Sequence, residues 1–510
     1  MPLDPDLVPE RPWWRDAVFY QVFVRSFQDA ETGPFSGDGK GDLQGLIDRL
    51  DYLNDGDPNT TDDLGITAIW LMPICESETY HGYDVEDYRK VDAELGTNEL
   101  FVELMHECHK RGIRLITDWV MNHSSWKHPW FLDAIQPESN SRERYIFRDP
   151  RPQSRGPWGQ NVWHDRMRTT SGASYYGVFS PTMPDLNLRD VRNTRDLHDA
   201  ATLWLTDLKA DGFRLDAIKF MVERFPDELD STQETLDWLS DFRAHAHTVN
   251  EDAFIVGEVW DNAEVVRKYI LADAVDSAFE FDLSYRIIDA LNEGDATELA
   301  KHIDRLAAIY PAQRGGHVYS TFLSNHDQTR TRTRLGGEIE KCKLAATIQM
   351  TLPGTPFIYY GEEIGMTGDK PDPELRTPMP WDPAKPNAGF TQADAPWKGF
   401  KDDPSEINVI DAHKPGGLGE HYRGLIRLRT SIPALRSDHI EVLETEHSSV
   451  LAFVRGSGRG ERVMVAVNLG EETQPIPAWA RPAGSRVVLG AARARDLQPG
   501  SALVLVTPAR

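Results

Sequence analysis

Acidic residues lie inside or directly after several apolar segments of this sequence, where burial would normally exclude a charge. Asp216 stands in GFRLDAIK, Glu258 in GEVW and Asp327 in SNHD. Two carboxylates on neighbouring strands are what the retaining hydrolysis of a glycosidic bond requires. One of them attacks the anomeric carbon, while the other protonates the leaving oxygen and then activates water. The residue types therefore indicate nucleophilic and acid–base chemistry at a sugar.

One of these segments also carries an arginine. Because strand side chains alternate between faces, Arg214 and Asp216 point the same way. A core ion pair explains this as well as a functional site does, since such pairs are common. In the functional interpretation Arg214 keeps Asp216 ionised, which suits a nucleophile. Glu258 lies between apolar neighbours that tend to raise a carboxyl pKa, which suits an acid/base. Asp327, beside His326, would stabilise positive charge developing on the sugar ring.

The elements that must position these residues alternate between strand and helix. Apolar runs of strand length recur with helical segments between them, which predicts parallel βαβ units. Seven strands are clear and a weaker one makes eight, so the sequence predicts an α/β fold with a (β/α)8 TIM barrel rather than an open sheet. The predicted strands span residues 17–24, 66–72, 113–120, 212–217, 254–259, 277–281 (the weaker one), 319–323 and 356–360.

Two regions interrupt this alternation. A connection of about 70 residues follows the third strand, and a segment that long in a compact barrel predicts an inserted lid domain. Near the C-terminus, short alternating strands at 450–454, 462–467, 486–489 and 502–506 predict an antiparallel β-sandwich. The predicted domains are a catalytic barrel (1–123 and 194–435), an inserted lid domain (124–193) and a C-terminal sandwich (436–510).

The inserted segment is rich in aromatic residues. A small domain must bury some of them as its own core, and we expect this for more than half; the others could stack on sugar rings. They are Trp126, Trp130, Trp158, Trp163, Tyr175 and Tyr176.

The ends of the predicted strands bring several polar residues to one place. In such a barrel the active site lies at the carboxyl ends of the strands, and three carboxylates, two histidines and an arginine converge there. A single Asp or His in this position is more often a cap or a loop hydrogen bond. No hydrophobic core requires all of them together, so the convergence favours a catalytic mouth.

Composition limits the partners. The net charge is −26, which disfavours nucleic acid and anionic membranes, and no apolar run is long enough to span a bilayer. The N-terminus MPLDPDLVPERPWW lacks the apolar core of a signal peptide. Three dispersed cysteines, Cys75, Cys108 and Cys342, are expected to be buried thiols in a reducing compartment. We therefore expect a cytoplasmic protein, a monomer or dimer, without nucleic-acid or membrane partners.

Four motifs carry a family resemblance. DWVMNH, GFRLDAIK, GEVW and SNHD, in that order, resemble the four signature regions of the α-amylase family of glycoside hydrolases. The resemblance covers nearly the whole chain and implies Asp216 as nucleophile, Glu258 as acid/base and Asp327 as transition-state stabiliser. It further implies a set of substrate contacts at the cleavage site: Tyr83, Asp84, His123, Arg214, Lys219, Trp260, His326 and, in RTPMPWD, Arg376.

Other segments refine this resemblance. MPDLN, at residues 183–187, looks like the intermediate subgroup between oligo-1,6-glucosidases and neopullulanases. Phe220 stands where many α-amylases of the family have a histidine on the leaving-group side, which puts endo-action on long chains in question.

A glycine-rich segment resembles a calcium loop of the family. FSGDGKGD keeps Asp38 and Asp42 but lacks the earlier acidic ligand, which Asp29 would replace only if the loop bulges. Calcium requires about six to eight oxygen ligands. The chemistry needs no cofactor, and a structural Ca²⁺ here is a prediction whose alternative is a plain glycine-rich turn.

The predicted function is that of a retaining glycoside hydrolase. We expect it to cleave α-1,4-glucosidic bonds of maltooligosaccharides or starch-type glucans, as an α-amylase or α-glucosidase, through a covalent glucosyl-enzyme intermediate. One alternative is an α-glucosyl transferase, similar to trehalose synthase or to a transglycosylating α-glucosidase. Another is a non-catalytic carbohydrate-binding barrel, which such a chain would become by losing a catalytic carboxylate.

Overall fold

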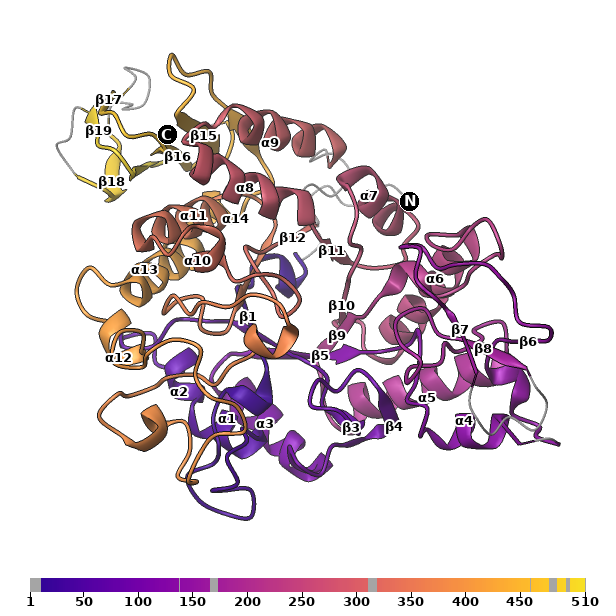
Figure 1. Cartoon of the computed structure of the whole chain (residues 1–510). Coiled ribbons are helices and arrows are strands. Elements are labelled where there is room, and N and C mark those ends of the chain that lie inside the picture. The colour runs from indigo at the N-terminus through magenta and orange to yellow at the C-terminus, as the bar shows by residue number, and fades with distance from the viewer. Residues whose placement is uncertain are drawn as a thin grey trace, which may run out of the picture.

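The computed structural model describes residues 11–136, 138–165, 173–310, 319–458, 460–476, 484–491 and 496–509. Its centre is a closed parallel barrel in which the strands follow the order β1-β13-β12-β11-β10-β9-β5-β2 (Figure 1). The barrel strands are β1 (Phe19–Val22), β2 (Ala68–Leu71), β5 (Arg114–Trp119), β9 (Gly212–Leu215), β10 (Phe254–Gly257), β11 (Ser277–Phe279), β12 (Tyr319–Thr321) and β13 (Thr355–Tyr359). The predicted TIM barrel is confirmed, including its weakest strand, β11.

The strands are shorter than predicted, and this matters most in β9. The apolar pattern extended that strand to residue 217, but it ends at Leu215. Ala217 adopts a left-handed conformation with φ 51°, so the chain turns sharply directly after Asp216. A non-glycine residue rarely adopts this conformation, and it places the carboxylate at the barrel rim instead of inside a strand.

Helices follow most of the strands and pack around the barrel (Figure 1). The long ones are α3 (Asn98–Lys110), α5 (Val191–Thr206), α6 (Gln233–Val249), α7 (Ala263–Leu271), α8 (Phe281–Glu293), α9 (Thr297–Ile309), α11 (Ile339–Thr351) and α13 (Leu418–Ser431). Short ones are α1 (Leu43–Asp48), α2 (Leu50–Leu53), α10 (Thr331–Arg334), α12 (Val409–Ala412) and α14 (Pro433–Arg436). Some of these helices begin at a side-chain cap: Thr97, for example, caps α3 by accepting a hydrogen bond from the Leu100 amide.

The insertion between β5 and α5 builds a small unit of its own. It contains α4 (Pro129–Ala134) and a three-stranded sheet in the order β6-β8-β7, from β6 (Phe147–Arg148), β7 (Trp163–His164) and β8 (Ser174–Tyr176). Trp163, Tyr175 and Tyr176 are fully buried there, as expected of aromatic residues that form the core of a small unit. Trp158 differs, because 60% of its surface is exposed.

Two antiparallel sheets complete the chain at the end opposite the insertion in Figure 1. One has the order β14-β15-β16-β20-β18, with β14 (Ile440–Val442), β15 (Val450–Arg455), β16 (Arg462–Asn468), β18 (Arg486–Leu489) and β20 (Ser501–Thr507). The other pairs β17 (Gln474–Pro475) with β19 (Asp496–Leu497). The predicted antiparallel C-terminal part is confirmed. The exact domain boundaries at 123/124, 193/194 and 435/436 stay a prediction.

Asp276 connects two strands and a helix at the amino-terminal face of the barrel. The Asp276 carboxylate, just before β11, accepts hydrogen bonds from the Ile255 amide at 2.8 Å and from Arg243 and His247 on α6. The hydrogen bond to Asp276 raises the pKa of His247, although burial and the nearby Arg243 oppose the increase. One carboxylate therefore joins β10, β11 and α6.

This contact predicts a pH-dependent contribution to stability. Because the pKa of His247 is raised on folding, its stabilisation is fully present below the unfolded value of about 6.5 and is lost as the pH rises through the folded value. We expect His247→Gln to lower the Tm more at pH 5.5 than at pH 8.5, measured by differential scanning calorimetry. His106→Gln, at an exposed position of α3, is the control. An equal loss at both pH values would contradict the ion pair.

The cysteines and helices agree with the other sequence expectations where the structure describes them. Cys75, Cys108 and Cys342 are buried free thiols. In the described ranges, no helix combines the length and the apolar character needed to cross a membrane. The segment in which a signal peptide was sought lies, up to residue 10, outside the described residues.

Candidate active site

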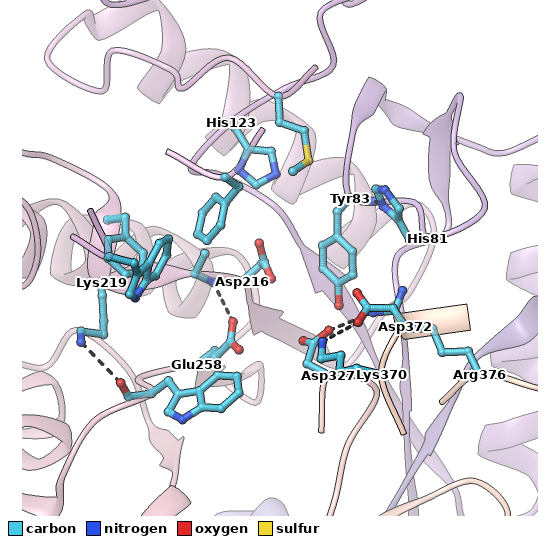
Figure 2. A pocket seen from close by; sticks show the side chains of 16 residues that line it. His81, Tyr83, His123, Asp216, Lys219, Glu258, Asp327, Lys370, Asp372 and Arg376 are labelled. Carbon is cyan, nitrogen blue, oxygen red and sulfur yellow. Dashed lines mark hydrogen bonds and ion pairs between the residues drawn. The ribbon is translucent and has the colours of Figure 1, made fainter. Parts of the chain in front are cut away.

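A cavity of about 560 Å³ opens where β9, β10 and β12 end, at the carboxyl face of the barrel (Figure 2). Asp216, Glu258 and Asp327 all line it, so the barrel brings together the three carboxylates singled out in the sequence. The other lining residues are His81, Tyr83, His123, Trp158, Phe179, Met183, Ala217, Lys219, Phe220, Trp260, Lys370, Asp372 and Arg376.

Arg214 lies beneath the cavity and is shared by three carboxylates. Its Nη1 contacts Asp118 and Asp216 at 2.8 Å each, and its Nη2 contacts Glu258 at 2.9 Å. The guanidinium also lies over the ring of Trp70, 5.1 Å from the ring centroid. Only 1% of the arginine side chain is exposed, so water contributes little to its solvation. Arg214 therefore orients both Asp216 and Glu258 from behind and does not line the cavity.

The sharing of Arg214 changes the expectation for Asp216. The sequence predicts that Arg214 keeps this carboxylate ionised, but the pKa of Asp216 is raised well above the usual value. Burial is the largest cause, and the neighbouring Glu258 and Asp118 add to it, whereas Arg214 opposes it. One buried cation faces several carboxylates, and this crowding favours retention of a proton in the unliganded site.

Glu258 has polar contacts that its apolar sequence neighbours did not indicate. Its Oε2 accepts a hydrogen bond from the Ala217 amide at 3.0 Å, drawn as a dashed line in Figure 2, and another from Arg214. Val256 and Val259 are fully buried. The sequence could not show the two polar contacts, because they form only when β9 pairs with β10.

Asp327 lies across the cavity between two cationic or hydrogen-donating groups. The His326 Nε2 is 2.9 Å from its Oδ2, and Arg376 Nη2 is 2.8 Å from its Oδ1. Burial alone would raise the pKa of Asp327, but His326 and Arg376 outweigh it and hold the pKa below its usual value. His326 is in turn held by Gln21, whose Nε2 is 2.8 Å from Nδ1, and by the Tyr83 hydroxyl. Asp327 is thus the carboxylate of this site that stays ionised.

His123 reaches the cavity from the end of β5. Burial lowers its pKa to about 3, so the imidazole is neutral over the whole physiological range. Its Nε2 is buried and has no hydrogen-bond partner among the described residues. A sugar hydroxyl is the kind of group that would satisfy this nitrogen.

The remaining predicted contacts divide into two groups. Tyr83, Lys219, Trp260 and Arg376 line the cavity, together with the three carboxylates and His123. Asp84 does not line it: the side chain is 2% exposed and accepts hydrogen bonds from Ser77 and Thr79 behind Tyr83. His326 is also covered and acts through Asp327 and Tyr83. The predicted contacts of Asp84 and His326 with the sugar stay predictions.

Sequence reasoning missed several lining residues. Lys370 and Asp372 enter from the loop after β13, where Asp372 contacts Arg376 at 3.4 Å and also pairs with Lys370. The four-residue spacing of Asp372 and Arg376 could have indicated that the two side chains form an ion pair. Phe179 and Met183 come from the insertion. Met183 begins the MPDLN motif, which indicated the subgroup but not a place in the cavity, and the local sequence of Phe179 gives no signal.

The predicted calcium loop has its carboxylates engaged elsewhere. Asp42 caps α1 through the Gly45 amide and also accepts from the Ala30 amide, both at 2.9 Å. Asp29 accepts from the Gly37 and Gly39 amides, and Asp38 accepts from the Lys40 amide. No group of three or more acidic, histidine or cysteine residues in the described ranges is arranged to hold a metal. The carboxylates of this loop therefore already accept backbone amides, and a structural calcium ion stays a prediction to be tested by chelation.

Removal of Arg214 is expected to destabilise the site in a pH-dependent way. Arg214→Met leaves Asp118, Asp216 and Glu258 buried without their cation, which typically costs about 3–5 kcal/mol. Carboxyls whose pKa is raised on folding lower the stability as the pH rises above their unfolded values. We expect a larger Tm loss at pH 8 than at pH 5, with Arg195→Met, an exposed position, as the control. Equal losses at the two pH values would show that the carboxylates are paired in another way.

The closed barrel and the carboxylate cluster at its carboxyl face define a class: barrel enzymes with a glycosidase-type site. Residues 21–438 match the family model described as "Alpha amylase, catalytic domain". Because this match covers most of the chain, the protein belongs to the α-amylase family of glycosidases, as the sequence motifs predicted.

The relatives span several activities within that family. An α-amylase 3 of Dictyoglomus thermophilum is 35% identical over 464 residues, covering 90% of this chain and 85% of the relative. An oligo-1,6-glucosidase of Heyndrickxia coagulans is 33% identical over 552 residues, covering 92% and 94%. A solved trehalulose synthase mutant superposes with a TM-score of 0.82 at 29% identity, covering 98% of this chain and 100% of that one. Relatives that include an α-amylase and an oligo-1,6-glucosidase are consistent with the predicted intermediate subgroup.

Proposed function

We propose that this protein hydrolyses α-1,4-glucosidic bonds of maltooligosaccharides or starch-type glucans with retention of configuration. The observation that carries the proposal is the pair Asp216 and Glu258, bound to the two terminal nitrogens of one arginine at the edge of one cavity. A retaining enzyme requires its two carboxyl groups about 5–5.5 Å apart, and attachment to a single guanidinium favours such a short separation over the wider spacing of an inverting enzyme.

In the first step Asp216 attacks the anomeric carbon as Glu258 protonates the leaving oxygen. The bond from C1 to that oxygen breaks, and an ester bond between C1 and an Asp216 oxygen forms. The step needs an ionised nucleophile and a protonated acid. Burial and the carboxylates around Arg214 raise the pKa of Asp216, so Asp216 must be ionised in the substrate complex for the attack to proceed.

In the second step water replaces the leaving group. Glu258, now a carboxylate, takes a proton from water as the water oxygen bonds to C1 and the ester to Asp216 breaks. Positive charge develops on the sugar ring in both transition states. Asp327 is ionised and lies in the cavity, and it supplies the compensating negative charge. Tyr83, His123 and Arg376 then bind the hydroxyls of the same glucosyl unit.

Product analysis tests the proposal directly. The protein is incubated with maltose, maltotetraose, pullulan and soluble starch, and the products are identified by mass spectrometry, with proton NMR of the first-formed anomer. Release of α-configured glucose or maltooligosaccharides is the expected result. A first-formed β anomer would exclude the retaining mechanism, and the absence of any product would leave a binding barrel.

A transfer reaction is the second candidate. The superposition on a trehalulose synthase supports it, since interception of the same intermediate by a sugar would give an isomer or a longer product. From maltose, glucose alone indicates hydrolysis, whereas trehalose or branched oligomers indicate transfer.

The proposal also covers the location and the partners of this protein. The three buried free thiols support a reducing, cytoplasmic compartment, and imported maltodextrins would then be the substrates. The charge of −26 supports the proposed lack of nucleic-acid and membrane partners. We propose a monomer or a dimer, which the molar mass from light scattering would distinguish.

A further inference from the structure

Gln21 is a polar residue in the otherwise apolar interior of the barrel. Side chains alternate along β1, so Gln21 shares a face with Phe19, which packs against Phe254 and Phe357 from other barrel strands. The Gln21 side chain is only 1% exposed and does not line the cavity. It therefore has no contact with a bound substrate, and its buried amide requires a hydrogen-bond partner within the protein.

The partner of Gln21 is the imidazole of His326. The Gln21 Nε2 lies 2.8 Å from His326 Nδ1, and the imidazole is fully buried. Two neighbouring rings fix the plane of this imidazole: Tyr83 stacks on it with 12° between the planes, and Trp70 meets it in a T-shaped contact. Because the ring is held in this way, its two nitrogens face different partners.

The partners of His326 Nε2 require a proton on that nitrogen. Asp327 Oδ2 lies 2.9 Å away, and an ionised carboxylate only accepts hydrogen bonds. The Tyr83 hydroxyl lies 2.5 Å from Nε2 and donates its own hydrogen to Asp118 at 3.3 Å, so its oxygen accepts from Nε2. His326 Nε2 is therefore a donor to Tyr83 and Asp327, which both line the cavity (Figure 2).

His326 Nδ1 then decides the charge of the imidazole. The amide NH2 group of Gln21 donates hydrogen bonds and does not accept them, so Nδ1 accepts from it and carries no proton. With its single proton on Nε2, His326 is neutral. A carboxylate in place of this amide would reverse the hydrogen bond, place a second proton on the ring and turn His326 into a cation.

The charge of His326 matters because this residue contacts Asp327 directly. Arg376 Nη2 lies 2.8 Å from Asp327 Oδ1, so the carboxylate already has one cation in contact. A second cation, at Oδ2, would offset the negative charge that a sugar ring needs when it becomes positive in the transition state. A neutral His326 orients Asp327 through a hydrogen bond without adding positive charge.

We propose that Gln21 is a positioning residue of this active site, which keeps Nδ1 of His326 unprotonated so that Asp327 can stabilise a positive sugar ring. This role rests on the proposed function, since it concerns the transition state of that reaction. The alternative is a structural role, in which the amide of Gln21 only satisfies buried polar groups inside the barrel.

Gln21→Glu and Gln21→Met separate these two roles. Glutamate keeps the shape of glutamine, but its carboxylate accepts from Nδ1 and makes His326 a cation. We expect kcat for maltotriose to fall about 10- to 10²-fold with KM within about threefold, because the lost stabilisation acts only in the transition state. Methionine removes the donor without supplying an acceptor, so the loss of kcat should be smaller. Variants that lose Tm but keep kcat would show a structural role and overturn the proposal.

Nitrogen NMR reads the protonation of His326 directly. The histidine rings are isotopically labelled, and the His326 signals are those missing from His326→Gln. In the unaltered protein Nδ1 should appear unprotonated and Nε2 protonated, whereas both should be protonated in Gln21→Glu. A proton on Nδ1 of the unaltered protein at neutral pH overturns the proposal. If Nδ1 stays unprotonated in Gln21→Glu, kcat should be retained, and a loss of kcat in that state also overturns it.

Gln233→Glu is the control, because it makes the same substitution at an exposed position of α6. It should keep kcat, Tm and the His326 signals. If the unaltered protein hydrolyses no maltooligosaccharide, the proposed function fails and the catalytic role of Gln21 fails with it. If turnover is normal and Gln21→Glu makes His326 a cation without lowering kcat, only the role of Gln21 is refuted.

Discussion

Asp216→Asn is expected to reduce kcat for maltooligosaccharides by at least about 10⁴-fold, because the covalent bond to C1 can no longer form. The amide keeps the shape of the side chain and its contact with Arg214. Hydrolysis of maltotriose, followed by release of glucose, measures the loss. Asp199→Asn, an exposed position on α5, serves as the control and should retain full activity.

The same substitution is expected to leave the fold intact and to raise its stability. Burial, Glu258 and Asp118 raise the pKa of Asp216, so ionisation of this carboxyl opposes folding more strongly as the pH rises above its unfolded value. A neutral amide removes that opposition, and the Tm at pH 7.5 should equal or exceed that of the unaltered protein. Activity above about 1% of normal would refute the role given to Asp216, and an unfolded variant would refute the expected gain in stability.

Glu258→Gln is expected to lower kcat for maltose about 10²- to 10⁴-fold, the usual contribution of a general acid and base. The loss should be far smaller for formation of the ester from α-glucosyl fluoride, since fluoride leaves without a proton. Hydrolysis of the ester stays slow in this variant, because no carboxylate activates water. Intact-protein mass spectrometry should then detect an increase of one glucosyl unit.

Azide provides the control for that result. The anion needs no general base, so it should attack the ester and restore turnover, giving α-glucosyl azide with net retention. The double variant Asp216→Asn, Glu258→Gln should form neither the ester nor the azide product. A Glu258→Gln variant that shows no rescue by azide and no accumulated ester would transfer the acid/base role to another carboxyl group.

The sequence motifs identified the barrel and its three carboxylates for local reasons. A buried parallel strand is a short apolar run in any context, and eight such runs separated by helices leave few other folds. Strand alternation also placed Arg214 and Asp216 on one face before any tertiary contact was known. Even the weak segment 277–281 contains a strand, β11, and counting it as the eighth is what favoured a barrel over an open sheet.

The sequence did not determine which charged side chains of the site contact one another. Arg214 contacts Asp118 and Glu258 as well as Asp216. These three carboxylates lie in β5 and directly after β9 and β10. The pKa of Asp216 is raised by burial and by the neighbouring carboxylates Glu258 and Asp118, which come together only in the closed barrel. Asp84 illustrates the same limit: the hydrogen bonds that it accepts from Ser77 and Thr79 come from the tertiary structure, and its contact with substrate stays a prediction.

The sequence by itself therefore determined the fold, the family and the three carboxylates that line the cavity, because strand and helix periodicity and the motifs at strand ends are local. Only the tertiary structure decided which residues from distant segments line the cavity with them. Trp158 and Phe179 come from the insertion, Phe220 follows β9 and Trp260 follows β10. Residues so far apart meet only when the barrel closes and the insertion packs over its mouth, and no local pattern encodes that meeting.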